Sequence, residues 1–427
     1  MIYLFEITMN VLKLSNIVES YVSGDWGNES YSDDKNLKVF CVRGADIIPI
    51  LNNDFSKIPV RYISQKSYTN RVLKAGDIII EKSGGSPTQS TGRAVIITEK
   101  LIQEKGAIVC SNFCVAIRIK QGWNPFYVFY LWQYLYNSYV FFNFEGKTSG
   151  IKNLQLDNAL QAITITEQPI SKQIQIANSI EVFDRKIALN REINRNLEAM
   201  ARQLYDYWFV QFDFPDENGR PYKSSGGKMV WNEKLKREIP EGWYDTKLSK
   251  IANITMGQSP DGSSYNEQGN GILFYQGSTD FGMRFPSIRL FTTSPTRFAK
   301  EGDILMSVRA PVGATNIANA DCCIGRGLAA MNSKLGSITH LYHIIQDLKT
   351  AFDLRNDAGT TFGSITKDDL YNLVVLKPTK SILELYENIC NPIFKQQMLV
   401  GRNIVHLIKQ RDELLPLLMN GQVNCDL

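Results

Sequence analysis

The sequence has few residues that would supply reactive chemistry. It holds only three histidines and no Gly-x-x-x-x-Gly-Lys-Ser/Thr loop for a nucleoside triphosphate. No nucleophilic serine elbow, zinc-finger spacing or nuclease-like carboxylate cluster stands out. His340 and His343 are three residues apart without a third metal ligand nearby in sequence, so we interpret them as packing or surface residues. These absences favour a binding protein over a catalyst.

Disulfide and export signals are also missing. The seven cysteines include no Cys-x-x-Cys pair, and Cys110, Cys114, Cys322 and Cys323 lie inside apolar runs. We interpret them as buried thiols in a reducing compartment and expect a cytoplasmic protein. The first ten residues have no basic start, and Glu6 interrupts their apolar run, so no signal peptide is expected.

The most apolar segment, residues 126–142, is unusually aromatic. Gln133, Asn137 and Ser138 interrupt it, and it barely reaches the length of a bilayer span. We therefore predict a helix packed on a sheet and no membrane association. The net charge of +4 is too small to indicate a particular partner.

Two Asn-Pro motifs invite comparison with amino-methyltransferases. Residues 124–127 (Asn-Pro-Phe-Tyr) and 391–394 (Asn-Pro-Ile-Phe) both lack the second proline of the Asn-Pro-Pro-Tyr/Phe motif. No glycine-rich cofactor loop follows a strand upstream of either. Methylation by this chain itself is therefore not expected.

Two long stretches carry a heptad pattern. Apolar residues recur at alternating steps of four and three over residues 174–209 and again about 210 residues later, which is typical of coiled-coil helices. The seam residues of the first stretch include Ile176, Ile180, Phe183, Ile187, Leu197 and Leu204. Those of the second include Ile393, Val400, Ile404, Leu407, Leu414 and Leu418. Polar residues also occupy the seams, at Asn190, Asn194, Gln397 and Arg411.

Shorter segments repeat in the same order in both halves. KLSNI at residues 13–17 returns as KLSKI at 247–251, and KAGDIII at 74–80 returns as KEGDILM at 300–306. A strand-like run precedes each long helix, AITI at 162–165 and LVVL at 373–376. The chain is therefore predicted to be built twice.

These patterns predict an α+β fold with an internal pseudo-two-fold repeat. Two β-rich domains alternate with two long helices, which pair as an antiparallel coiled coil because neither buries its apolar stripe alone. The predicted boundaries are a first β-rich domain at 1–168, a helical region at 169–213, an irregular linker at 214–240, a second β-rich domain at 241–378 and a second helical region at 379–427.

Polar loops near the repeated strands are the candidate binding surface. Gln, Ser and Arg are side chains that recognise base edges, while Lys, Arg and backbone amides hold phosphates. The candidates in the first half are Lys74, Ser83, Gly84, Ser86, Gln89 and Arg93. Those in the second half are Gln258, Ser259, Tyr265, Gln276, Ser278, Lys300, Arg309 and Arg326. Ordinary turns remain the alternative for any single loop.

Several stretches resemble the specificity (S) subunits of type I restriction–modification enzymes. LEAMARQLYDYWFVQFDFP at 197–215 is similar to the end of that family's central helical region. GGKMVWNEKLKREIPEGW at 226–243 is similar to the lead into its second target recognition domain. ITMGQSPDGSSYN at 254–266 and IGRGLAAM at 324–331 resemble motifs of that domain. The first recognition domain matches less clearly.

The resemblance implies a function in DNA recognition. Each target recognition domain would read half of a bipartite, asymmetric site in double-stranded DNA. The helical regions would set the gap and dock two methyltransferase (M) subunits. S-adenosylmethionine, ATP and Mg would be bound by those subunits and by restriction/translocase (R) subunits, while this chain would bind no cofactor or metal and catalyse nothing.

Roles for individual side chains follow as hypotheses. Arg309 and Arg326 would bind guanine or phosphate, and Gln258 and Gln276 would bind adenine. Lys74, Arg93 and Lys300 would contact phosphates, although the two lysines begin repeated strands and a structural role is equally open. The alternatives are a fused or unrecognised DNA methyltransferase or nuclease, and a coiled-coil scaffold without DNA affinity.

Overall fold

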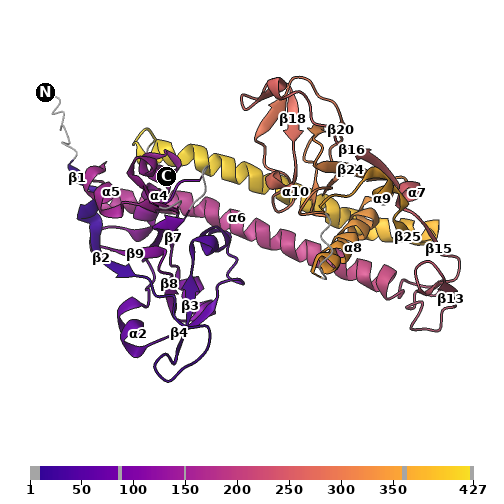
Figure 1. The fold of residues 1–427 in the computed structure, drawn as a ribbon, viewed down its shortest axis with the longest axis horizontal. Coiled ribbons are helices and arrows are strands. Elements are labelled where there is room, and N and C mark those ends of the chain that lie inside the picture. Colours follow the sequence, from indigo (N-terminus) through magenta and orange to yellow (C-terminus); the bar gives the residue numbers. More distant parts are fainter. Residues whose placement is uncertain (1–9, 85–88, 149–150, 358–362, 424–427) are drawn as a thin grey trace. The chain divides into compact units, whose positions relative to one another are not determined.

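The computed structural model describes residues 10–84, 89–148, 151–357 and 363–423. The chain divides into two compact units (Figure 1): unit 1 comprises residues 1–188 and 406–427, and unit 2 comprises residues 189–405. Each unit contains a β-rich domain and a part of both long helices. Within the described ranges, no helix has the length and apolar character needed to cross a membrane.

Within the described residues, the β-rich domain of unit 1 contains four sheets. β1 (Val11–Lys13) pairs with β12 (Thr164–Thr166). The largest sheet has the order β2 (Val18–Ser23), β9 (Cys114–Ile119), β5 (Ile78–Glu81), β7 (Ala94–Ile96). The others are β4 (Val60–Ile63), β3 (Leu37–Val42), β8 (Ile108–Cys110) and β10 (Glu145–Thr148), β11 (Ile151–Leu154), β6 (Ser83–Gly84). The helices are α1 (Ile47–Leu51), α2 (Gln65–Arg71), α3 (Glu99–Lys105), α4 (Pro125–Asn137) and α5 (Leu156–Ala162).

Unit 2 repeats this plan. β15 (Tyr244–Lys247) pairs with β25 (Val374–Lys377). One sheet has the order β16 (Ala252–Met256), β24 (Leu328–Ser333), β21 (Ile304–Ser307), β22 (Thr315–Ile317). The other is β17 (Tyr265–Asn266), β19 (Leu290–Thr292), β18 (Ile272–Tyr275), β23 (Cys322–Ile324), β20 (Phe298–Ala299). The helices are α7 (Leu248–Ile251), α8 (Ile338–Asp357) and α9 (Lys367–Asn372).

The predicted internal repeat is confirmed in the pairing of the strands. β1 and β15 each pair antiparallel with the strand that precedes a long helix, β12 and β25. β3 and β8 pair in parallel, as do β18 and β23. The repeated Lys-x-Gly-Asp segments form the same turn, in which the aspartate carboxylate accepts the lysine N–H at 2.8 Å, Asp77 from Lys74 and Asp303 from Lys300.

The aromatic segment of unit 1 forms helix α4, as predicted, and packs into the core. Trp132 is 1% exposed and donates its indole N–H to the Gly92 carbonyl at 2.8 Å. Asn124 caps the helix, since its side chain accepts the Tyr127 N–H at 2.9 Å. The first Asn-Pro motif is thus a helix start.

Both long helices are present. α6 spans Ile170–Tyr205 and continues as a π-helical turn, Asp206–Val210, while α10 spans Lys380–Met419. In unit 1 the beginning of α6 shares a core with the end of α10, through Ile180 and Leu418. In unit 2 Trp208, just after α6, lies 5.7 Å from Tyr386 near the start of α10. Each unit therefore contains an antiparallel helix pair.

All twelve predicted seam residues are at least half-buried. The buried ones are Ile176, Ile180, Ile187, Val400, Ile404 and Leu418. The half-buried ones are Phe183, Leu197, Leu204, Ile393, Leu407 and Leu414. Two polar seam residues make specific contacts: Gln397 donates to Glu198 at 2.7 Å, and Arg411 donates to Asp184 at 2.8 Å. These pairs provide hydrogen-bond partners for polar groups that would otherwise be buried without one.

The expectation of an irregular linker at 214–240 is wrong for its second part. β13 (Met229–Asn232) and β14 (Arg237–Pro240) form an antiparallel hairpin. Phe214 stacks on Trp243 with ring centroids 4.9 Å apart and belongs to the core of unit 2. The frequent glycines and prolines mark tight turns here, while the aromatic residues between them are buried.

His340 and His343 are packing residues of helix α8. Their rings lie 4.4 Å from Phe209 and 5.0 Å from Tyr205, respectively. Burial lowers the pKa of His340 to about 3 and that of His343 to about 4, so both are neutral near pH 7. No group of three potential metal ligands occurs in the part of the chain that the structure describes.

Candidate nucleic-acid interface

Four segments meet at one end of the sheets in each unit. They follow β2, β3 and β5 and form the β8–β9 turn in unit 1, and they follow β16, β18 and β21 and form the β23–β24 turn in unit 2. We call this place the loop edge. It comprises residues 24–27, 43–44, 82–84 and 111–113 in unit 1 and residues 257–260, 276–277, 308–310 and 325–327 in unit 2.

The same three backbone hydrogen bonds connect these segments in both units. In unit 1 they are Asp25 N to Cys110 O (2.8 Å), Ser111 N to Val42 O (2.9 Å) and Lys82 N to Phe113 O (2.9 Å). In unit 2 they are Gln258 N to Ile324 O (3.0 Å), Gly325 N to Tyr275 O (2.8 Å) and Val308 N to Gly327 O (2.9 Å). The two loop edges therefore have one backbone frame.

In each frame, a glycine occupies the position where the loop lies closest to the opposing turn. A Cβ atom on Gly24 would lie 2.0 Å from the Ser111 carbonyl oxygen, and one on Gly257 would lie 2.1 Å from that of Gly325. No side chain fits at either position without moving the backbone. The loop after the first long strand is therefore held directly against the opposing turn.

This common frame assigns each position in unit 1 a partner in unit 2. The equivalent pairs are Asp25 and Gln258, Trp26 and Ser259, Arg43 and Gln276, Ser83 and Arg309, and Asn112 and Arg326. The structure thus brings together five residues nominated from the second half of the sequence, namely Gln258, Ser259, Gln276, Arg309 and Arg326.

The long polar side chains of the unit 2 loop edge are available to a ligand. Gln258, Gln276, Arg309 and Arg326 are all exposed. None of the four has a side-chain hydrogen bond or ion pair with another described residue. Ser259 instead supports the turn, because its hydroxyl accepts the Arg326 N–H at 3.3 Å.

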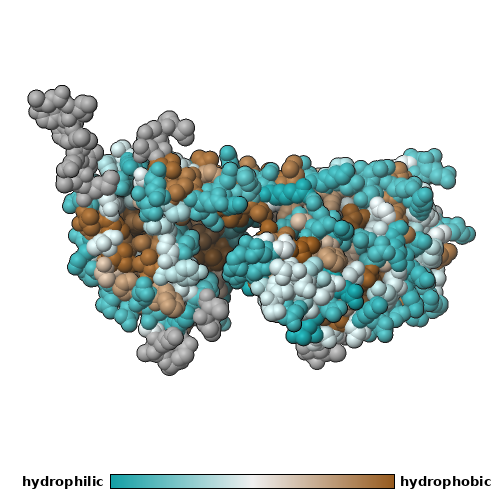
Figure 2. All heavy atoms as spheres, turned by 90° about the horizontal axis from the view of Figure 1, so that it is seen from above, coloured by the Kyte–Doolittle hydropathy of each residue, from teal (hydrophilic) through white to brown (hydrophobic). Residues whose placement is uncertain are grey.

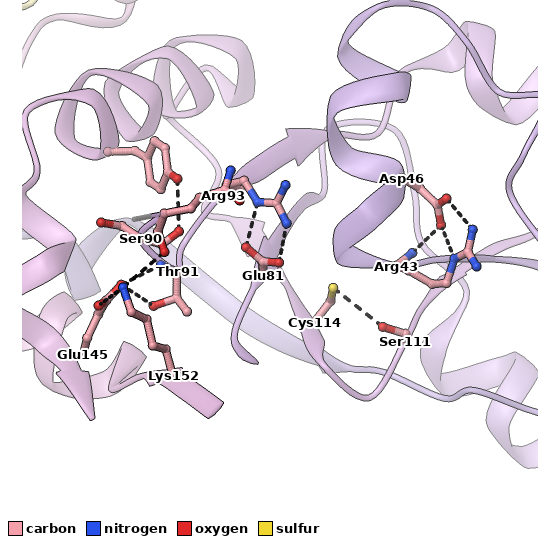
Figure 3. A network of polar contacts seen from close by, with 12 residues as sticks. Arg43, Asp46, Glu81, Ser90, Thr91, Arg93, Ser111, Cys114, Glu145 and Lys152 are labelled. Carbon is pink, nitrogen blue, oxygen red and sulfur yellow. Dashed lines mark hydrogen bonds and ion pairs between the residues drawn. The ribbon is translucent and has the colours of Figure 1, made fainter. Parts of the chain in front are cut away.

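The unit 1 loop edge is more strongly paired within itself. Arg43 donates to the Asp46 carboxylate through Nε and a terminal nitrogen at 2.9 and 2.8 Å (Figure 3). This hydrogen-bonded pair raises the pKa of Arg43. Ser83 donates its hydroxyl to Asn153. Asn112 is exposed, and its side chain has no partner among the described residues.

Asp25 is held in its charged form. Burial pushes its pKa upward, but hydrogen bonds from the Ser67 hydroxyl and the Gly27 N–H, together with the charge of Arg71, outweigh this effect and lower the pKa. Asp25 therefore presents a carboxylate acceptor whose lone pairs are partly used by its own domain.

A cavity of about 580 Å³ opens at the unit 1 loop edge, with Trp26 and Phe113 among its lining residues. Phe113 is 60% exposed, and the Arg61 guanidinium lies 4.1 Å from the centroid of Trp26. Glu81, also in the lining, pairs with Arg93 at 2.8 Å (Figure 3). This cavity has aromatic walls and a polar floor.

Several nominated residues lie elsewhere. Lys74 and Lys300 begin the turns before β5 and β21, so they lie at the opposite ends of these strands from Ser83 and Arg309. Strands of this length separate their two ends by about 13 Å. The turn role is therefore supported for both lysines. Arg93 is occupied by Glu81, which raises its pKa through their hydrogen bond.

The remaining candidates make local contacts. Tyr265 donates its hydroxyl to the Pro260 carbonyl at 2.9 Å and packs on Phe274. Ser278 begins a short 3₁₀ turn, Gly84 belongs to β6, and Gln89 is exposed and accepts Lys152 on its carbonyl at 3.2 Å. Ser86 lies outside the described residues.

Sequence reasoning missed Asp25, Trp26, Arg43, Asn112 and Phe113 of the unit 1 loop edge. The offset between equivalent residues changes from one segment to the next because the halves differ in insertions. Aligning the Lys-x-Gly-Asp segments places Ser83 opposite Arg309, but it gives no register for the other loops. The paired strands supply that register.

Comparisons with known proteins agree with this architecture. Residues 8–199 match the family model described as "Type I restriction modification DNA specificity domain". The MjaX specificity subunit of a type I restriction enzyme from Methanocaldococcus jannaschii is 32% identical over 262 residues, which cover 60% of this chain and 57% of that protein. The MjaIX specificity subunit from the same organism is 25% identical over 317 residues, covering 68% of this chain and 70% of that protein.

Over part of its length, this chain is therefore similar to type I restriction–modification DNA specificity proteins. A crystal structure of a type I S subunit from M. genitalium has the same fold, with a TM-score of 0.55, 14% identity and 97% coverage of both chains. The family model ends within helix α6, at residue 199. Unit 2 lies largely beyond it, yet repeats the frame of unit 1 hydrogen bond for hydrogen bond.

Proposed function

We propose that this chain is the DNA specificity subunit of a type I restriction–modification complex. The loop edge of each unit reads one half of a bipartite, asymmetric site in double-stranded DNA. The observation that carries this proposal is the pair of loop edges with one backbone frame and different side chains at all five equivalent positions. A repeated frame suits a repeated ligand such as the duplex, and different side chains suit two different base sequences.

Base recognition rests on side chains that the frame holds at the protein surface. In unit 2, Arg309 and Arg326 are suited to the O6 and N7 acceptors of guanine, and Gln258 and Gln276 to the N6 and N7 atoms of adenine. All four are long, exposed and unpaired within the described residues. They therefore lose no internal hydrogen bond when they bind a base edge.

The long helices set the gap between the half-sites and dock two methyltransferase subunits. Large apolar side chains point outward along both helices, among them Val182, Leu189, Met200, Leu385 and Leu399. Most of the face shown in Figure 2 is hydrophilic, with separate apolar patches. Outward apolar residues on helices are expected where partner subunits cover them.

One groove in unit 2 is a specific candidate for such docking. It has a volume of about 630 Å³ and is lined by Met200, Tyr207, Ile389 and Ile393, among others. Tyr205, two residues before Tyr207, faces the opposite way, since it is 5% exposed and belongs to the core. Of the two tyrosines, Tyr207 is therefore the one available to a partner.

Polar anchors hold each β-rich domain on its helix pair. In unit 2, Arg284 is 5% exposed and pairs with Glu198 of α6 at 3.1 Å, and Gln397 of α10 donates to the same carboxylate. In unit 1, Tyr130 donates to Asp184 of α6 at 2.7 Å, and Arg411 of α10 donates to that carboxylate too. These contacts give each β-rich domain a defined orientation on the helices of its own unit.

Catalysis belongs to partner subunits in this proposal. The methyltransferase subunits bind S-adenosylmethionine and modify adenine, and the restriction/translocase subunits use ATP and Mg. Apart from the linker at 214–240, the domain boundaries predicted from the sequence are retained as part of the proposal.

The test compares the purified chain with the chain plus its methyltransferase subunits. The chain alone is expected to transfer no methyl group and to cut no DNA, while the complex retards duplex DNA in a gel and methylates adenine. Methyl transfer or cleavage by the chain alone would favour an enzyme with an unrecognised site. A complex that forms but never binds DNA would favour a scaffold.

A further inference from the structure

We propose that Asn112 and Arg326 each specify one base pair, an A·T pair in the half-site of unit 1 and a G·C pair in that of unit 2. The inference rests on the proposed function and adds a residue, Asn112, that the sequence did not single out. The two side chains occupy the same position in equivalent turns, between β8 and β9 and between β23 and β24.

The backbone presents both side chains identically. The residue before each one donates its N–H to the end of the neighbouring parallel strand, Ser111 to Val42 and Gly325 to Tyr275. The carbonyl of the residue after each one accepts the N–H of the residue that follows β5 or β21. Phe113 accepts from Lys82, and Gly327 accepts from Val308. Each turn is thereby held on both sides of the presented residue.

The opposing loop holds the turn from a third side. Gly24 approaches the Ser111 carbonyl, and Gly257 approaches the Gly325 carbonyl, so closely that a Cβ atom would overlap either oxygen. A turn fixed at three points presents its side chain with little loss of backbone freedom on binding. Position along the duplex is then set by the frame, and the choice of base by the side chain.

The two side chains at this position carry different hydrogen-bonding groups and therefore suit different bases. An asparagine amide pairs with the N6 and N7 atoms of adenine, and an arginine guanidinium pairs with the O6 and N7 atoms of guanine. Both side chains are exposed and unpaired within the described residues. Arg43 and Ser83 of unit 1 are already bonded to Asp46 and Asn153, whereas the Asn112 side chain has no partner among the described residues.

The experiment uses the complex of this chain with its methyltransferase subunits. Affinity is measured for duplexes in which each base pair of the half-sites is replaced in turn. Asn112→Ala should lower discrimination at a single A·T position by roughly 5- to 150-fold. All other positions should stay within about twofold of the unsubstituted complex, because well-separated base contacts act nearly independently.

The reciprocal exchange sharpens the test. Asn112→Arg should move the preference at that position from A·T to G·C, and Arg326→Asn should move one position of the other half-site from G·C to A·T. Gln103→Arg, on the exposed face of helix α3, adds the same charge to unit 1 outside the loop edge. It should leave every preference unchanged.

Two results would overturn the inference while the proposed function stands. One is a base preference over the bipartite site that Asn112→Ala leaves unchanged at every position. The other is an equal loss on all duplexes, which marks a phosphate contact. A complex that shows no base preference before any substitution would overturn the proposed function as well. Asn112 lies on an exposed turn, so its alanine variant should fold, and elution with the methyltransferase subunits checks this.

Discussion

The two loop edges differ in their side chains far more than in their backbones. Among the described residues, unit 2 presents four long polar side chains without internal partners, whereas unit 1 has bonded most of its own and adds the aromatic rings of Trp26 and Phe113. The equivalent hydrogen bonds show that one backbone geometry carries different side chains in the two units. Under the proposed function, such a duplicated domain acquires a second specificity through changes in a few surface residues.

The floor of the two edges differs in the same way. Glu81 at the end of β5 pairs with Arg93, and the equivalent positions in unit 2 are Ser307 and Ala314. The Ser307 hydroxyl donates to the Pro311 carbonyl and accepts the Ala314 N–H at 2.9 Å. A buried ion pair in one unit thus corresponds to a neutral hydroxyl in the other, and the same fold accommodates both.

The largest effect is expected from a substitution in the backbone frame itself. Gly257→Ala forces a Cβ atom against the Gly325 carbonyl, and we expect unit 2 to be destabilised by about 4 kcal/mol or more, with loss of its half-site. Gly262→Ala is the matched control, since a Cβ atom there meets nothing within 4 Å. Denaturant unfolding and DNA binding measure both variants. Equal stability of the two would show that the contact is not tight.

The ion pair beneath the unit 1 edge gives the next effect. Arg93→Ala leaves the Glu81 carboxylate, whose side chain is 4% exposed, without its partner, and should cost about 3 kcal/mol. The double substitution Glu81→Ser with Arg93→Ala copies unit 2 and should recover most of that loss. Denaturant unfolding of the two variants decides the matter. A double variant as unstable as the single one would refute the equivalence of these positions.

A pH dependence should distinguish the units. His340 has a folded pKa of about 3 against an ordinary value of 6.5, so its burial stabilises unit 2 fully above pH 6.5. That contribution is lost as pH falls below 6.5, because the unfolded state binds a proton that the folded state excludes. The loss for this residue is about 2 kcal/mol at pH 5.

Replacement of His340 by phenylalanine tests this effect. The variant should unfold with a shallower pH dependence than the parent between pH 6.5 and 5, as followed by urea titration at each pH. The third histidine, His406, is exposed in unit 1. An identical pH dependence in parent and variant would exclude His340 as its source.

The smallest effect is expected at the repeated lysines. Lys300→Ala removes an exposed ion pair with Asp321, and Lys74→Ala removes an exposed charge, both at the far ends of the strands from the loop edges. Neither should alter base discrimination or the salt dependence of DNA binding. A salt slope lowered by about one in either variant would mark a phosphate contact instead.

The spacing of apolar residues predicted the architecture, because the pattern can be read from residues that are only a few positions apart. Ile176, Ile180 and Ile187 predicted a helix and its buried stripe from spacing alone, and the Lys-x-Gly-Asp segments marked equivalent turns. The loop edge of unit 1 could not be predicted in this way. Trp26, Arg43 and Asn112 come from three distant segments, and only strand pairing brings them together.

Composition misled at the segment between the units' domains. Glycine and proline in 214–240 predicted irregular structure, whereas Phe214 and Trp243 anchor a folded hairpin region in the core of unit 2. Burial of aromatic rings decided the outcome there, and turn-forming residues served the hairpin.

We propose that one backbone frame, used twice, reads two different sequences. The most direct measurement is to express the chain with its methyltransferase subunits in a host without adenine methylation and to map modified adenines across the genome. We expect a motif of two unrelated halves separated by a fixed gap. A single continuous motif, two identical half-sites or no modified adenine would contradict it.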